Sequence, residues 1–396
     1  MIRVAIVVPG FKLGGGVLSM GLFLHQTMQN SGKFKPEFVS LATSANDEYS
    51  VRALNPISWI KGVRTVKGIW RSFPYTHVGA YGAEFEVQRY QPRKILTQLL
   101  ESYDLIQVVS GGPAIGFAVS HVNKPKCIFV ATRVNEERKA RLAKTIGIRK
   151  LWLSYMTEVA SKLETKALMV MDHVFAESEY TRQLLASHVN ETKLSLGFPG
   201  IDTNLFHPIK HYNAESYILS VGRFADPRKN IRLLLEAYRK VRANNESAPR
   251  LVLAGLEGPL PKDWQLAIDW GVADFIDVRT NVSTYELAEL YRNASLFLLS
   301  SDEEGLGIVI LEAMASGLPV ISTHCGGPAT AIIEGETGVL TPIGDADAMA
   351  QEITTLLNAT DTRHRMSNAG RKRAVSTFSL TAAGAAYLAV YKELLS

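Results

Sequence analysis

The sequence has few cysteines, and this scarcity limits its redox and metal chemistry. Cys127 and Cys325 are the only two among 396 residues. The chain can therefore form at most one disulfide, and so low a count is typical of a reducing compartment. The chain also lacks a CxxC pair and an HExxH motif, which argues against a structural zinc site.

Long apolar runs are missing as well. No segment approaches the roughly 18 consecutive apolar residues that a transmembrane helix needs. Residues 2–8 are apolar, but Gly10 and the glycines at 14–16 follow without a small-residue cleavage site. This pattern predicts a buried first strand rather than a signal peptide. With 46% hydrophobic and 20% charged residues, the chain has the composition of a soluble globular protein, and we expect it in the cytoplasm.

Positive charge is unevenly distributed along the chain. Residues 1–210 contain 26 Lys and Arg and 16 Asp and Glu, giving +10, and the remainder contains 17 and 22, giving −5. The two values add to the net charge of +5. A basic first half indicates an anionic partner for that half, although a basic surface can also serve solubility alone.

Short apolar runs alternate with helical stretches through both halves, which predicts two doubly wound α/β domains with parallel sheets. The expected strands of the first half are RVAIVV, EFVSLA, LIQVVS, CIFVAT and HVFAES. Those of the second half are YILSVG, RLVLAG, DFIDV, LFLLS and LPVIST. We expect a linker within residues 199–212, which hold Pro199, Gly200 and Pro208.

The strongest chemical signal is the segment SSDEEGLGIVILEAMASG, residues 300–317. It predicts a strand, an acidic loop with glycines, and a helix that begins near Gly307. Such a helix start at the carboxyl end of a strand can bind a phosphate. Glu304 in the loop and Glu312 on the second helical turn could accept hydrogen bonds from a sugar and a ribose, or could simply pair on the surface.

Three further loops follow predicted strands. In VGRFADPRKN, residues 221–230, Arg223 and Lys229 could neutralise a diphosphate and stabilise it as a leaving group. The glycines of VVPGFKLGGGVLS, residues 7–19, could admit a phosphate, but the segment is not a GxGxxG motif. HCGGPATAI, residues 324–332, could line a sugar site.

Together these elements resemble the retaining GT-B glycosyltransferases of the family 4 kind. The resemblance is most specific after residue 199, in GIDTNLFHP, VGRFADPRKN, EGLGIVILEAMASGLPVIST, CGGP and GETGVL. It implies two Rossmann-like domains with a cleft between them. The linker and the facing loops of two separate sheets predict that the domains close over the donor. The implied segments are an acceptor-side domain over residues 1–205, a nucleotide-sugar domain over 206–378 and a final helix over 379–396 that returns to the first domain.

The resemblance also implies roles for individual residues. Arg223 and Lys229 would contact the donor diphosphate, Glu304 the transferred sugar and Glu312 the ribose. The remaining donor-binding positions implied by the family are glycines and one leucine in the two loops: Gly15, Gly16, Gly305, Leu306 and Gly307. No metal and no cofactor is required, because the two cations supply the positive charge, and the co-substrate is a UDP- or GDP-linked sugar.

Two positions depart from the family pattern. Many relatives have a histidine after the strand that here reads CIFVAT, whereas this chain continues with residues 132–135, where Arg133 or Asn135 would occupy the same space. The family's glutamate after the GGP turn is replaced by GGPATAI, with Thr330 nearby. We expect sugar or base selectivity to differ accordingly.

The sequence predicts a glycosyltransferase that retains the anomeric configuration. A sugar phosphorylase or nucleotide-sugar epimerase on the same fold is the first alternative, and a non-catalytic nucleotide-sugar sensor is another. An NAD-dependent oxidoreductase is disfavoured, because the first turn lacks GxGxxG and no acidic residue ends EFVSLA.

The segment WIKGVRTVKGIWRSF, residues 59–73, predicts a basic amphipathic helix with Trp on its apolar side. Such a helix would lie on an anionic membrane or near a charged, lipid-linked acceptor. A core-packed helix or an irregular acceptor loop is the alternative, because Gly62 and Gly68 weaken helicity. No nucleic acid is expected as a partner.

Overall fold

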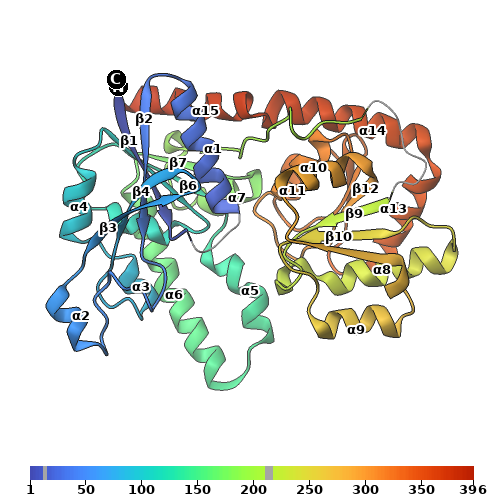
Figure 1. The fold of residues 1–396 in the computed structure, drawn as a ribbon, viewed down its shortest axis with the longest axis horizontal. Helices are drawn as coiled ribbons and strands as arrows, with labels where there is room; N and C mark the ends of the chain where they lie inside the picture. Colours follow the sequence, from blue (N-terminus) through green and yellow to red (C-terminus); the bar gives the residue numbers. More distant parts are fainter. Residues whose placement is uncertain (12–15, 210–216) are drawn as a thin grey trace. The chain divides into compact units, whose positions relative to one another are not determined.

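Two doubly wound α/β units make up the chain, each with its own sheet. The computed structural model describes residues 1–11, 16–209 and 217–396. The first unit consists of Met1–Pro199 and Ala383–Ser396, and the second of Gly200–Ala382. Both sheets are largely parallel and carry helices between successive strands (Figure 1). The predicted fold class of two Rossmann-like domains is confirmed.

The sheet of the first unit has eight strands in the order β3-β4-β2-β1-β5-β6-β7-β8. Its strands are β1 (Ile2–Pro9), β2 (Phe34–Leu41), β3 (Thr65–Trp70), β4 (Phe73–Val78), β5 (Leu105–Ser110), β6 (Lys126–Val130), β7 (His173–Ala176) and β8 (Leu194–Leu196). Every neighbouring pair is parallel except β3 with β4. All six residues of β5 are buried, as expected for a strand that is covered on both faces.

The helices of the first unit connect these strands. They are α1 (Gly16–Asn30), α2 (Pro56–Lys61), α3 (Glu86–Arg89), α4 (Lys94–Leu100), α5 (Val134–Lys144), α6 (Gly147–Met169), α7 (Glu179–Leu185) and α15 (Leu380–Leu394), with 3₁₀ turns η1 (Pro113–Val119) and η2 (Glu191–Lys193). Within the described parts of the chain, no helix combines the length and apolarity needed to cross a bilayer.

The prediction of one helix over residues 59–73 is wrong. Helix α2 ends at Lys61, and the chain then forms the antiparallel pair β3–β4. Gly62 ends the helix with a positive φ of 65°, and the β3–β4 turn also has positive φ at Arg71 and Ser72. A Cβ at Gly68 would meet the Tyr75 ring at 2.6 Å, so this glycine serves close strand packing. The cations of the segment therefore do not share one helical face.

The final helix α15 completes the first unit, although it follows the second unit in sequence. Tyr387 and Tyr391 are fully buried. The Tyr387 ring centroid lies 6.0 Å from that of Phe23 on α1 and 4.4 Å from that of Phe175 on β7. The helix thus packs on both α1 and the sheet.

The second unit has a six-stranded sheet in the order β11-β10-β9-β12-β13-β14. Its strands are β9 (Tyr217–Val221), β10 (Leu251–Gly255), β11 (Ile276–Thr280), β12 (Ala294–Leu299), β13 (Val320–Thr323) and β14 (Gly338–Thr341). Its helices are α8 (Ile231–Asn244), α9 (Pro261–Asp269), α10 (Thr284–Asn293), α11 (Ile308–Ala315), α12 (Pro328–Ala331), α13 (Ala346–Asn358) and α14 (Thr360–Arg373). Shorter turns are η3 (Pro227–Lys229), η4 (Ala273–Phe275) and η5 (Ala374–Phe378).

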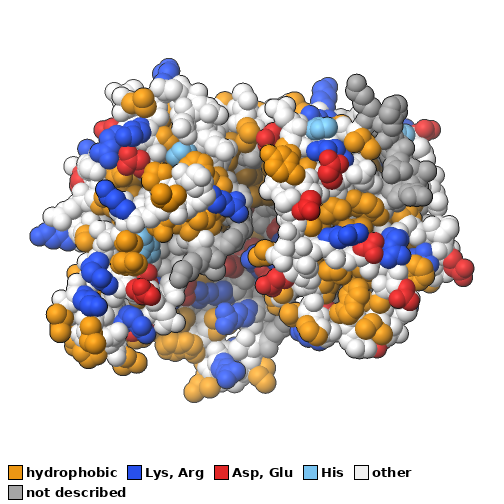
Figure 2. Space-filling model, in the orientation of Figure 1, with side chains coloured by type: hydrophobic (Ala, Val, Ile, Leu, Met, Phe, Trp, Pro, Cys, Tyr) orange, Lys and Arg blue, Asp and Glu red, His pale blue; other side chains and the backbone are white. Residues whose placement is uncertain are grey.

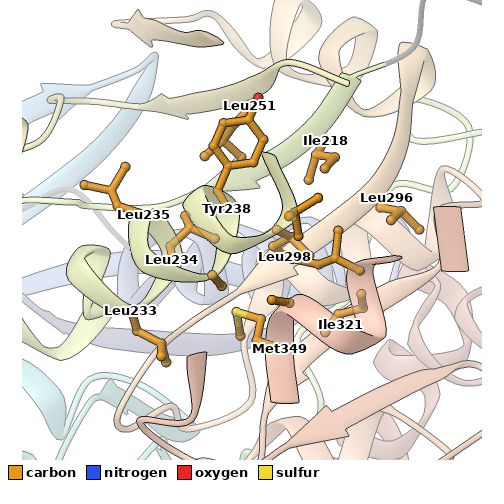
Figure 3. Close-up of a cluster of buried hydrophobic side chains, with 14 of the residues drawn as sticks. Ile218, Leu233, Leu234, Leu235, Tyr238, Leu251, Leu296, Leu298, Ile321 and Met349 are labelled. Atoms are coloured by element: carbon orange, nitrogen blue, oxygen red, sulfur yellow. The ribbon is translucent and has the colours of Figure 1, made fainter. Parts of the chain in front are cut away.

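A dense apolar core fixes the second sheet beneath its helices. Leu234 and Tyr238 of α8 are fully buried and belong to one cluster with Leu298 of β12 and Met349 of α13 (Figure 3). The hydroxyl of Tyr238 donates to backbone carbonyls at 2.9 and 3.2 Å, so its polar atom is satisfied. This core holds the loops at the carboxyl ends of the strands in fixed positions.

The boundary between the two units falls between Pro199 and Gly200. Residues 200–205 lie with the second unit, where Ile201 exchanges backbone hydrogen bonds with Phe378 and Leu380. Part of the predicted linker, residues 210–216, lies outside the described residues.

Candidate active site

The predicted donor residues follow two neighbouring strands of the second unit. Strands β9 and β12 are hydrogen-bonded partners. The chain leaves β9 toward β10 on one side of the sheet and leaves β12 toward β13 on the other. Ligands of open α/β sheets bind at such a switch point, outside the carboxyl ends of the strands. Arg223 and Lys229 follow β9, and Glu304 follows β12.

The loop after β9 is held by its own ion pairs. Arg223 lies 3.2 Å and Arg228 2.9 Å from Asp226. Burial would raise the pKa of Asp226, but the hydrogen bonds from Arg228 and the charges of Arg228 and Arg223 together keep the pKa below its ordinary value. The Arg223 side chain stays more than half exposed. Asp226 therefore steers Arg223 while leaving its guanidinium open to a ligand.

Lys229 and Glu304 form an ion pair that joins the two loops. Both side chains are mostly buried, and Glu304 also accepts a hydrogen bond from Ser301 Oγ at 2.7 Å. A second pair, Arg228 with Glu303 at 2.9 Å, runs beside the first. In the described residues, no group of three or more His, Cys, Asp or Glu side chains is arranged to hold a metal.

Backbone contacts strengthen the same junction. The amide of Asp302 donates to the carbonyl of Arg228 at 2.7 Å, and Asn230 Nδ2 donates to Asp302 Oδ1 at 2.7 Å. Ser300 Oγ donates to the carbonyl of Lys229 at 2.9 Å. Asn230, which has a positive φ of 43°, also caps α8 through Leu233 N. The geometry of the two loops is thus set before any ligand binds.

The loop after β13 packs against the loop that carries Glu304. Gly327 N donates to the carbonyl of Glu304 at 3.0 Å, and Glu304 N donates to the carbonyl of Cys325 at 3.2 Å. A Cβ at Gly327 would lie 1.9 Å from the Gly305 carbonyl oxygen. Only glycine therefore permits this close approach. Thr330 lies in the short helix α12 just beyond it.

Glu312 lies on the second turn of α11, as predicted. Its Oε2 accepts a hydrogen bond from the Tyr291 hydroxyl at 2.9 Å. Burial raises the pKa of Glu312 to about 7, and the Tyr291 hydrogen bond partly offsets that rise. Tyr291 itself is fully buried on α10. Glu312 is therefore a positioned carboxyl group that titrates near neutral pH.

The glycines assigned to donor binding lie in different places. Gly307 is the N-cap of α11 with a φ of 86°, and Gly305 and Leu306 precede it. Gly16 is exposed at the start of α1 in the first unit, and Gly15 lies outside the described residues. The structure brings Gly305, Leu306 and Gly307 together with Lys229 and Glu304.

Arg133, at the position after CIFVAT, is buried in the first unit. Its Nε donates to Glu164 Oε2 at 3.2 Å, and Glu164 also accepts from the Val134 amide at 3.0 Å. Asn135 Nδ2 donates to Ser161 Oγ at 3.3 Å. Both side chains are thus tied to α6 of their own unit.

Two cavities lie apart from these loops. One of about 290 Å³ lies at the amino ends of β12 and β13, with Pro208, Arg292 and Arg371 in its lining. This is the edge of the sheet opposite to the loops that carry the predicted residues. The other, of about 100 Å³, lies in the first unit beyond the ends of β1 and β5, beside the Arg138–Glu86 ion pair.

Arg228, Asp302 and Tyr291 are the positioning residues that sequence reasoning missed. The first two lie in the segments that carry Lys229 and Glu304, and a pairing between a basic and an acidic loop after adjacent strands could have been anticipated. Nothing in the sequence links Tyr291 with Glu312, because their contact depends on how α10 packs on α11.

Residues 202–373 match the model of the family described as Glycosyl transferases group 1. One relative is an MMP alpha-(1->4)-mannosyltransferase of Mycolicibacterium hassiacum. The two sequences are 30% identical across an aligned segment that covers 50% of this chain and 47% of that protein. This chain is also 32% identical, over 51% of its length, to a GDP-mannose-dependent alpha-(1-6)-phosphatidylinositol monomannoside mannosyltransferase of Mycobacterium tuberculosis, covering 56% of it. These matches span about half the length of each relative.

Solved structures resemble the whole fold. Sucrose-phosphate synthase from Thermosynechococcus elongatus superimposes with a TM-score of 0.72 at 19% identity, covering 100% of this chain and 99% of that one. Anabaena HepE in complex with UDP-glucose gives a TM-score of 0.70 at 15% identity, covering 99% and 100%. At these identities the likeness shows the fold alone.

Proposed function

Because the chain has the GT-B fold and its second half is a glycosyl transferases group 1 domain, we propose that it is a retaining glycosyltransferase. It takes a sugar from a nucleoside-diphosphate donor and places it on an acceptor hydroxyl. The observation that carries this proposal is the junction at the β9–β12 switch point, where Lys229 and Glu304 join two loops.

Each side chain of the junction has a role in this proposal. Arg223 and Lys229 bind the diphosphate and stabilise its charge as it leaves, which is the main electrostatic demand of the reaction. Glu304 accepts hydrogen bonds from the transferred sugar, and Glu312 accepts them from the ribose. Gly305, Leu306 and Gly307 bring backbone amides close to the phosphates at the start of α11.

The reaction retains the configuration at the anomeric carbon. The acceptor oxygen attacks from the face that the diphosphate leaves, the bond from the sugar to the diphosphate breaks, and the acceptor proton passes to the departing phosphate. The protein contributes positioning and charge stabilisation, with no requirement for a metal.

The donor base is uracil or guanine. The Mycobacterium tuberculosis relative is described as GDP-mannose-dependent and Anabaena HepE as binding UDP-glucose, so both classes are candidates for this chain. The acceptor is anionic or lipid-linked. The charge of the first half and the words phosphatidylinositol monomannoside in that relative's name support this part of the proposal. We propose with it a cytoplasmic location at the inner membrane face.

The test is a panel of UDP- and GDP-sugars, scored first by thermal stabilisation and then by release of nucleoside diphosphate on addition of acceptor. Release that depends on an acceptor separates a transferase from a phosphorylase, an epimerase or a sensor. Lys229→Ala should cut turnover about 10²–10³-fold, because one charge-stabilising contact is lost.

Lys240→Ala is the matched control for this substitution. Lys240 lies on α8 of the same unit and pairs with the exposed Asp347, so its loss should leave turnover unchanged. Normal turnover in Lys229→Ala, with intact thermal stability, would overturn the proposed donor site.

A further inference from the structure

An unpartnered apolar stripe lies at the tip of the α5–α6 pair in the first unit. Ile148, Leu151, Trp152 and Tyr155 are 83%, 72%, 63% and 60% exposed. They occupy positions i, i+3, i+4 and i+7 of α6 and so lie on one side of the helix. Burial of α6 in the unit begins only at Thr157, so the first two to three turns project beyond the sheet (Figure 1).

The chain around this stripe is mainly basic. Residues 138–157 contain no Asp or Glu and six cations: Arg138, Lys139, Arg141, Lys144, Arg149 and Lys150. Two of these cations, Arg138 and Lys139, pair with Glu86 and Glu136. Arg149 and Lys150 are exposed on α6 beside the stripe, and Arg141 is exposed on α5. Figure 2 shows hydrophobic and basic side chains intermixed at this tip.

The turn between the two helices extends the apolar surface to its end. Ile146 is exposed at the N-cap of α6. Gly147 has a φ of 64° and reverses the chain direction there. Trp152 and Tyr155 lie with ring centroids 6.3 Å apart, and both residue types favour the boundary between water and lipid.

A second group of exposed apolar side chains lies on α2 of the same unit. Ile57 and Ile60 are exposed there, and the indole ring of Trp59 is held by its Nε1, which donates to the Arg52 carbonyl at 2.6 Å. Residues 49–83 also contain no Asp or Glu, while five cations are present: Arg52, Lys61, Arg64, Lys67 and Arg71. Two apolar points with basic surroundings can orient a domain on a plane, which a single point cannot.

From this surface we propose that the α5–α6 tip is a docking element for an anionic phospholipid bilayer, with α2 as a secondary contact. The apolar stripe enters the boundary between headgroups and acyl chains, and the cations meet the lipid phosphates. The inference stands on the surface alone and does not depend on the proposed sugar transfer.

Charge decides between this occupant and the others. A second copy of the chain would bring together two tips that each carry an excess of positive charge, which like-charge repulsion opposes. A nucleic acid offers phosphates but nothing that would bury Ile148 and Leu151. An anionic membrane supplies both negative charge and an apolar phase at one boundary, which matches the mixed surface of the tip.

The experiment is co-sedimentation of the full chain with vesicles of phosphatidylcholine alone or mixed with phosphatidylglycerol, at low and high salt. We expect binding to the mixed vesicles only, weakening as salt rises. Replacing Lys150 by Ala should reduce partitioning about fivefold, which corresponds to ~1 kcal/mol for one cation at an anionic surface. Leu151→Ser with Trp152→Ser should abolish sedimentation.

Ile268→Ser is the matched control, because Ile268 is an exposed apolar residue of α9 in the other unit. This variant should bind the mixed vesicles as strongly as the unsubstituted protein does. Nucleoside-diphosphate affinity, measured in parallel, should be unchanged in every tip variant, so failure here and failure of the proposed function are distinguishable. Binding that is absent at low salt, or equal on neutral vesicles, would overturn the proposal. Concentration-dependent self-association that Trp152→Ser removes would overturn it in favour of a protein contact.

Discussion

At the scale of single residues, the two glutamates of the candidate site differ in their partners. Glu304 is paired with Lys229 and with Ser301, whereas Glu312 contacts the Tyr291 hydroxyl. Glu304 is therefore part of an ion pair, whereas Glu312 is held by an uncharged donor on a neighbouring helix.

This difference predicts separable effects of two substitutions. Glu312→Ala should weaken the binding of free nucleoside diphosphate, because ribose hydrogen bonds are lost, by about 1.5–3 kcal/mol for hydrogen bonds to a charged group. Glu304→Ala should lower turnover of the nucleotide sugar far more than nucleoside-diphosphate affinity. Calorimetry that gives the reverse pattern would exclude this assignment.

The raised pKa of Glu312 predicts a pH dependence with a defined sign. Because burial raises its pKa to about 7, the folded protein holds this proton more strongly than the unfolded chain does. Stability should therefore fall as pH rises from the ordinary carboxyl range to 7. Nucleotide-sugar affinity should rise over roughly one unit on either side of pH 7, since the ionised carboxylate accepts ribose hydroxyls.

Two variants isolate this effect. Glu312→Gln should flatten both profiles, because the amide does not titrate. Tyr291→Phe should move the affinity midpoint to higher pH, because the hydrogen bond that favours the ionised form is lost. Fluorescence or calorimetric titrations with a nucleotide sugar across this range are the measurement, and an unchanged midpoint in Tyr291→Phe would contradict the positioning role.

At the scale of elements, the loops after β12 and β13 of the candidate site depend on a close backbone approach between Gly305 and Gly327. Gly327→Ala would place a Cβ 1.9 Å from the Gly305 carbonyl oxygen, so one loop must move. A displacement on the order of 1 Å can cost about 10²-fold in rate, and we expect a loss of that size in kcat/KM. Gly370→Ala, within α14 and with neighbours at ordinary contact distance, should keep full activity and gain stability.

Elements with strong local signals could be predicted from sequence, and those set by packing could not. Helix α11 begins at Ile308 directly after Gly307, where the glycine and the apolar run predicted it. Residues 65–78 instead form β3 and β4, because Gly68 makes room for the Tyr75 ring. The stripe on α6 has the spacing of a core-facing helix, and only the structure shows that Ile148, Leu151, Trp152 and Tyr155 are exposed among the described residues.

At the scale of the whole molecule, alternating strands and helices predicted two doubly wound units, since that pattern buries parallel sheets on both faces. The antiparallel edge strand β3 could not be anticipated, because its pairing is decided by β4. The positions of Arg223, Lys229 and Glu304 beyond strand ends were predictable, because the carboxyl ends of parallel strands meet at one edge of a sheet.

Helix α15 packs into the core of the first unit through Tyr387 and Tyr391. We expect substitutions of these two tyrosines to have contrasting effects on stability. The Tyr391 hydroxyl donates to Gln107 Oε1 at 2.7 Å, and Gln107 is fully buried in β5. The Tyr387 hydroxyl, one helical turn earlier, is buried without a hydrogen-bond partner among the described residues. Tyr391→Phe should destabilise the first unit by about 1–3 kcal/mol, because a buried amide oxygen loses its donor.

Tyr387→Phe should be neutral or stabilising, since it removes an unsatisfied buried hydroxyl and keeps the ring between α1 and the sheet. Each variant is the control for the other, because both replace Tyr by Phe on the same face of α15. Urea denaturation gives the free energies, and hydrogen exchange of β5 amides locates the loss in the first unit. Equal costs for the two substitutions would show that α15 is held by ring packing alone, without the contribution assigned to Gln107.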